Sequence, residues 1–179
     1  MADHDRGSLH RGGEAPPQLH VPRPDESAPA DEMAMARRWL THLRESAIFK
    51  LEDLDDDQLR WTPVAGANSL GQIVMHLGYF ERLWVRAIFA GEAMDMSWRQ
   101  EMFVVPQGWS TDDLVAFYRG ETAAADAVLE VAESFDLRSK GEMRPTTLRW
   151  VVTHMVEEIA RHLGHMDITR QLLDGRTGR

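Results

Sequence analysis

The sequence predicts an all-α protein of 179 residues, a four-helix bundle with a long apolar loop between its second and third helices. Four segments repeat apolar residues at the spacing of an amphipathic helix, and none alternates apolar and polar residues as a half-buried strand does. Residues typical of helix starts and ends mark the limits of three of these four segments. The predicted helices cover residues 32–51, 69–90, 110–134 and 145–173.

The first 30 residues differ in composition from the rest of the chain. They carry five of the eight prolines, mixed charges and almost no large apolar side chains. Such a segment cannot bury enough apolar surface to offset the entropy of ordering it. We therefore expect a disordered extension at 1–30, followed by one bundle domain at 31–179. Metal binding is not expected from the irregularly spaced histidines of the extension, His4, His10 and His20.

The net charge and the composition indicate which kinds of molecule the protein binds. The net charge is −9 and the sequence pI is about 5.3, which disfavours nucleic acid and anionic membranes because both are bound through basic surfaces. The chain contains no apolar run of the length that spans a bilayer and no hydrophobic signal region near its start. We expect a cytoplasmic protein that acts on a small molecule.

The absence of cysteine decides which metal ligands and nucleophiles are available. With no thiolate in the chain, any bound metal must be held by nitrogen and oxygen atoms. A reaction that uses a thiol would have to take it from another molecule.

The first predicted helix, residues 32–51, carries His42, which is more typical of a half-exposed helix residue than of a ligand. An acidic connector follows at residues 52–63. In it, Leu54, Leu59 and Trp61 are expected to pack back onto the bundle.

The second predicted helix opens with a capping box formed by Ser69 and Gln72 and stops at Gly91. His76 lies inside its apolar face. A buried histidine needs partners for both ring nitrogens, so His76 is either a core residue bonded to backbone or water, or a metal ligand.

The loop at residues 92–109 is long and apolar for a connection in a bundle. It is interpreted as a lid over a cleft, as a contact in a homodimer, or as a crossover that packs on the core. Ser110 and Asp113 then cap the third helix, and the length of the connections allows a crossover in place of simple up-and-down order.

The fourth helix concentrates the candidate functional residues. At about 100° per residue, His154, Glu158, His162 and His165 share one narrow arc at the border of the buried stripe. Imidazoles and a carboxylate four residues apart are typical metal ligands. Residues eight apart are separated by about 12 Å of rise and cannot reach one ion, so the helix offers one pair, either His154 with Glu158 or Glu158 with His162. The alternative is an amphipathic helix with histidines at its edge.

Three segments together resemble the DinB superfamily. They are Leu59-Arg60-Trp61 after an acidic turn, HLGYFERLW at 76–84 and HMVEEIARHLGH at 154–165. The resemblance covers about residues 32–175 and is strongest to the branch similar to mycothiol-dependent maleylpyruvate isomerases.

What the resemblance implies is a metal centre at His76, Glu158 and His162. Many relatives have histidine where this chain has Glu158, whereas the isomerase-like branch has glutamate. His154 and His165 are then candidates to contact a ligand or face the substrate. Three protein ligands with one open position are typical of a catalytic site. The implied cofactors are a divalent ion, zinc foremost, and mycothiol or another low-molecular-weight thiol that the metal activates for transfer or isomerisation.

Three functions remain open from the sequence. The first is a metal-dependent thiol transferase or isomerase, which requires thiol-dependent turnover. The second is a non-catalytic bundle that binds a metal or small molecule in a stress or resistance response, which requires tight binding without turnover. The third is a bundle whose histidines are structural, which requires protein that contains no metal.

Overall fold

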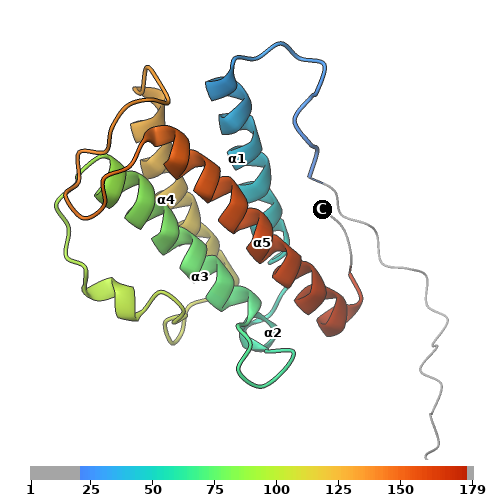
Figure 1. Ribbon diagram of the computed structural model, residues 1–179. Helices are drawn as coiled ribbons and strands as arrows, with labels where there is room; N and C mark the ends of the chain where they lie inside the picture. The colour runs from blue at the N-terminus through green and yellow to red at the C-terminus, as the bar shows by residue number, and fades with distance from the viewer. Residues whose placement is uncertain (1–20, 177–179) are drawn as a thin grey trace, which may run out of the picture.

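The structure, a computed structural model, describes residues 21–176 (Figure 1). Most of the predicted extension at 1–30 therefore lies outside the described residues, as do His4, His10 and His20. The described part of it, residues 21–30, has no helix or strand, and two of its carbonyls, those of Pro22 and Ala28, accept hydrogen bonds from side chains of the first helix. The His42 ring donates through Nδ1 to the carbonyl of Pro22, 3.0 Å away.

The fold is all-α, as predicted. Within residues 21–176 there is no strand, and the one β-type pairing is an isolated bridge between Arg138 and Thr147. Four long helices are joined by shorter helical segments. In chain order the elements are α1 (Glu32–Phe49), α2 (Asp56–Arg60), α3 (Leu70–Glu81), the π-helix η1 (Arg82–Phe89), the 3₁₀ helix η2 (Ser97–Gln100), α4 (Thr111–Glu130) and α5 (Leu148–Asp174).

The predicted capping boxes are confirmed. The Ser69 hydroxyl accepts from the Gln72 backbone N–H at 3.2 Å, and the Gln72 side chain accepts from the Ser69 N–H at 2.9 Å. Ser110 and Asp113 form the same reciprocal pair at the start of α4. Two donors that a helix start would leave unpaired are satisfied in each case, which fixes where α3 and α4 begin.

Several predicted boundaries were wrong. The connector at 52–63 contains α2, and Trp61 is exposed instead of packed, although Leu54 and Leu59 are buried. α4 ends at Glu130 and not near residue 134. α5 begins at Leu148 and not at residue 145, because Thr147 is extended, pairs with Arg138 in the isolated bridge and caps the helix.

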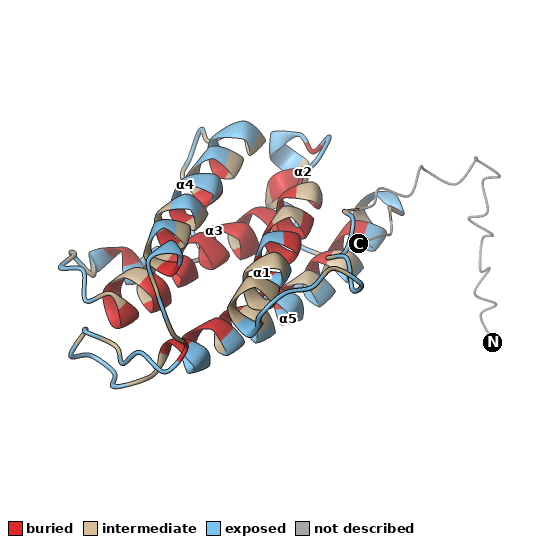
Figure 2. Ribbon diagram, turned by 90° about the horizontal axis from the view of Figure 1, so that it is seen from above, coloured by how far each residue is buried: buried red, intermediate tan, exposed pale blue. Residues whose placement is uncertain are grey.

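The long helices form a bundle in which α5 packs between α1 and α3 (Figure 1). α3 also packs on α4, and buried residues line the facing sides of the helices (Figure 2). α1 packs mainly on α5, the last helix, and not on α3, the next long helix in the chain. α3 and α4 run in the same direction (Figure 1), so the long connection between them is a crossover, as the sequence allowed. The packing places α3 and α5 side by side.

A buried ion pair ties three of the long helices together. The Arg44 guanidinium of α1 donates to both carboxylate oxygens of Glu81, at 2.7 and 2.8 Å, and to Asp126 of α4 at 2.7 Å. Arg44 and Glu81 are both buried. Charges removed from water are tolerated only when they are paired in good geometry, and this bidentate contact meets that condition.

The loop at 92–109 packs back on α3. Trp98 stacks on Tyr79 with ring centroids 5.0 Å apart, and the Arg82 guanidinium lies over both rings. Arg60 donates to the carbonyls of Pro106 and Trp109 at 3.0 and 2.9 Å, which anchors the end of the loop. Of the described helices, none has the length and apolarity that crossing a membrane would require.

Candidate metal centre

His76 of α3 meets Glu158 and His162 of α5 in the interior of the bundle. The Nε2 atoms of His76 and His162 lie 3.3 and 3.2 Å from the same oxygen of Glu158, Oε1. One potential ligand atom from each of the three residues lies within 4.8 Å of the others. Within residues 21–176, this is the one group of three such side chains.

Local sequence explains how the three side chains converge. Glu158 and His162 are four residues apart, so they project from the same side of α5, one turn from each other. His76 projects from α3 inside its apolar face, and the packing of α3 on α5 brings it opposite that pair. Both histidines are buried, at 8% and 9% exposed. The centre thus depends on one helix–helix contact and one helical turn.

The protonation states favour metal binding. Burial lowers the pKa of His76 and of His162 below the ordinary value, and the nearby Glu158 carboxylate only partly opposes this. Burial also opposes ionisation of Glu158, but the hydrogen bond from His76 and the field of His162 outweigh it, and the pKa of Glu158 is lowered. Near neutral pH the site therefore holds two neutral imidazoles and one carboxylate, which are the forms that bind a cation.

The donor set and its spacing fit a divalent transition metal. When a tetrahedral ion binds two ligand atoms with metal–ligand bonds of about 2.0–2.1 Å, these two atoms lie about 3.3 Å apart. The distances from Nε2 of His76 and of His162 to Oε1 of Glu158 are close to this value. Two histidines and a glutamate form a known catalytic zinc set, and two histidines with a carboxylate also occur at mononuclear iron sites. The Nδ1 atoms of both histidines are buried without a hydrogen-bond partner in the described residues. A metal ion at this site would be held by His76, Glu158 and His162.

Phe103 covers one side of this centre. Its ring stacks on the His76 imidazole with centroids 4.4 Å apart and planes 8° apart. Phe103 belongs to the loop at 92–109, so the loop that was interpreted as a lid, a dimer contact or a crossover contacts a predicted ligand directly. The sequence marked this loop as apolar but did not indicate which of its side chains reaches the site.

His165 lies beside the centre and faces a cavity. Its ring meets that of His162 edge to face, with centroids 5.6 Å apart. His165 is exposed and lines a cavity of about 310 Å³ together with Asn68, Ile168 and Thr169. Neither His165 nor Asn68 makes a side-chain hydrogen bond to the described residues, so both polar groups are available to a molecule in this cavity.

His154 packs into an aromatic cluster next to the centre. Its ring packs against Phe80, Trp84 and Trp150 at centroid distances of 5.1, 4.7 and 4.7 Å. Phe80 also packs against His76, so it lies between His76 and His154. The acidic side chain nearest to the His154 ring is Glu157, 3.5 Å from Nδ1, and not Glu158.

Comparison with known proteins identifies the family. The model of the mycothiol-S-transferase family matches residues 35–175, most of the chain. The chain belongs to the mycothiol-S-transferase family. This membership confirms the resemblance to DinB-like mycothiol enzymes, and the matched residues include the whole candidate centre.

A solved structure supports the fold. The crystal structure of a conserved protein from Enterococcus faecalis is similar to this chain with a TM-score of 0.62 and 14% sequence identity. The similarity covers 83% of this chain and 100% of that one. At such identity it shows a shared helical fold and nothing about activity. No curated protein matches the sequence significantly.

Proposed function

We propose that the protein is a metal-dependent S-transferase that joins mycothiol to a small electrophile. The convergence of His76, Glu158 and His162 carries this proposal, and membership of the mycothiol-S-transferase family supports the choice of thiol. A divalent ion held by these residues, zinc in our proposal, would supply the Lewis acidity that lowers the pKa of a thiol at its open position.

The residues around the centre have separate roles in this proposal. The cavity beside His165 receives the thiol, and Asn68 offers hydrogen bonds to its polar part. His165 accepts the thiol proton, because it is exposed to the cavity and touches His162. Phe103, stacked on the buried His76 ring, keeps water from that side of the site.

Transfer and isomerisation differ in what happens to the thiol. In transfer, a carbon–sulfur bond forms, the leaving group departs with the bonding pair, and the thiol proton is released. One thiol is consumed in each turnover. In isomerisation the thiol adds and is eliminated again, so none is consumed. We favour transfer because the matched family model describes transferases.

The test is a conjugation assay with the untagged full-length protein loaded with zinc. Monochlorobimane serves as the electrophile and mycothiol as the thiol, with glutathione as the comparison. We expect conjugate to form with equal loss of mycothiol, a rate that falls after chelation and returns with zinc, and little activity with glutathione. His162→Ala should lack this activity.

Two results would favour a different function. Turnover of an unsaturated substrate with complete recovery of mycothiol would favour an isomerase. Tight binding of mycothiol or metal with no turnover of any electrophile tested would favour the non-catalytic binding bundle.

A further inference from the structure

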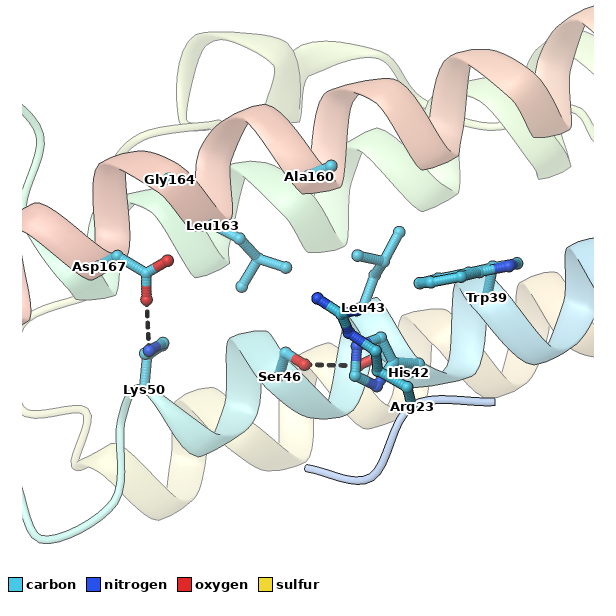
Figure 3. Close-up of a pocket in the computed structure, with 10 residues that line it drawn as sticks. All are labelled: Arg23, Trp39, His42, Leu43, Ser46, Lys50, Ala160, Leu163, Gly164 and Asp167. Carbon is cyan, nitrogen blue, oxygen red and sulfur yellow. Dashed lines mark hydrogen bonds and ion pairs between the residues drawn. The ribbon is translucent and has the colours of Figure 1, made fainter. Parts of the chain in front are cut away.

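A second cavity lies between α1 and α5, away from the metal centre (Figure 3). Its volume is about 300 Å³. Ala160, Gly164 and Asp167 line it from α5, and at 100° per residue they project from the side of that helix opposite Glu158. The cavity is therefore separate from the site proposed for the thiol.

Small side chains on α5 create this space. Ala160 and Gly164 face α1, and a Cβ atom added at Gly164 would meet no atom within 4 Å. Leu43 of α1 and Leu163 of α5 form the apolar middle of the cavity (Figure 3). The cavity has the size of the smaller sites that bind organic molecules and is lined mainly by apolar groups, as such sites are.

Two cationic side chains line the cavity. Lys50 is buried at one end and pairs with Asp167 (Figure 3). Arg23 lies beside His42 and makes no hydrogen bond or ion pair with any residue of 21–176. The hydrogen bond from His42 to Pro22 holds the segment that carries Arg23 against α1. The lining thus contains two cations and one anion in a protein whose net charge is −9.

We infer that this cavity is a second binding site, for a compact organic carboxylate. Its carboxylate pairs with the Arg23 guanidinium, which matches carboxylate geometry and lacks a partner within the described chain. Its apolar body lies between Leu43 and Leu163, beside the half-exposed ring of Trp39. The inference uses no residue of the metal centre and stands independently of the proposed transferase activity.

Titration of the full-length protein with phenylacetate, benzoate and hexanoate tests the inference. Binding is measured by calorimetry and by the indole N–H resonance of Trp39, which Trp39→Phe assigns. We expect at least one of these carboxylates to bind saturably and to shift that resonance. Its uncharged amide should bind at least about tenfold more weakly, because a charge-assisted hydrogen bond contributes about 1.5–3 kcal/mol, or about ten- to a hundredfold in affinity.

Three variants sharpen the test. Arg23→Gln should weaken binding about ten- to a hundredfold, whereas Arg99→Gln, the same charge change on an exposed residue of η2, should not. Gly164→Leu should fill the cavity and abolish binding while helix content and metal content stay unchanged. The inference is overturned if none of the three carboxylates binds saturably, if the amide binds equally well, or if Gly164→Leu binds as the wild type does.

Discussion

At the scale of single residues, the candidate centre combines three side chains whose ionisation is coupled. Burial lowers the pKa of His76 and His162, and the two histidines lower the pKa of Glu158 against its own burial. In the metal-free protein each of these groups binds protons less readily than in the unfolded chain. Acid should therefore destabilise the fold through all three.

The first prediction concerns this pH dependence. For a histidine with a lowered pKa, stability is fully present above the unfolded value of about 6.5 and is lost as pH falls toward the folded value. Glu158 adds a further loss below its ordinary value of about 4.5, with the same sign. The urea midpoint of metal-free protein should thus fall from pH 7 to pH 5. In the double variant His76→Gln, His162→Gln that fall should be smaller; an equal fall would show that other groups cause it.

A second prediction separates His165 from His154. His165→Ala should reduce conjugation by about 10²–10⁴-fold and leave the metal bound, since loss of a proton-transfer group has effects of that size. His154→Phe should retain both metal and activity, because a phenyl ring suits the aromatic cluster of Phe80, Trp84 and Trp150. Loss of metal in His165→Ala, or of activity in His154→Phe, would contradict these roles.

The sequence could predict which residues lie along the same edge of a helix, but not which side chains of other helices pack against that edge. Spacing left two pairs open on the fourth helix, His154 with Glu158 or Glu158 with His162. The apolar face around His76 fitted a core residue as well as a ligand, and it was the family resemblance that selected His76, Glu158 and His162. The position of His154 depends on Trp84, which comes from a π-helix on another segment, and no spacing within 148–174 contains that information. The metal-ligand assignment itself remains a prediction.

At the scale of elements, the loop at 92–109 both packs on the core and covers the centre. Stacking of Trp98 on Tyr79 and the two hydrogen bonds from Arg60 hold it on the bundle. Phe103 then lies on His76. The loop therefore restricts one approach to the site without supplying a ligand.

The third prediction follows from this contact. Phe103→Ala removes the ring that covers His76, so a chelator such as EDTA should remove the metal several times faster, with little change in the amount bound at saturation. Val104→Ala, which shortens an exposed side chain in the same loop, is the matched control and should behave as the wild type does. Equal removal rates in both variants would mean that Phe103 does not shield the site.

Elements with strong local signals were the ones that the sequence predicted well. Reciprocal capping by Ser69 and Ser110 fixed two helix starts because both partners are local. α2 was missed because its capping box, Asp55 with Gln58, lies in a short acidic segment. The early end of α4 was missed because Phe135 continues the helical spacing of apolar residues. Phe135 is buried, but it lies in the turn that follows α4 and not in the helix.

At the scale of the whole molecule, the buried contact of Arg44 with Glu81 and Asp126 fixes α1 against α3 and α4. Replacing a buried pair by well-packed apolar residues is often neutral, whereas removing one partner alone is strongly destabilising because it leaves an uncompensated buried charge. The sequence did not predict it, since the partners lie 37 and 82 residues apart.

The fourth prediction tests that contact. Glu81→Ala leaves a buried guanidinium with one partly exposed partner, so the free energy of unfolding should fall by about 3–5 kcal/mol. Arg119→Ala breaks the exposed pair with Glu45 and should cost less than about 1 kcal/mol. Chemical denaturation of the two variants compares them directly, and similar losses would mean that burial of the Arg44 contact has no special role.

Metal content is the most direct measurement of the central claim, that His76, Glu158 and His162 together hold one divalent ion. Full-length protein purified without an affinity tag or added metal should contain close to one equivalent by elemental analysis. Alanine at any of the three positions should lower the metal affinity by more than the ten- to hundredfold typical of residues that only support a ligand. The account is contradicted if the wild type contains no metal and binds none on addition, or if His76→Ala retains wild-type occupancy.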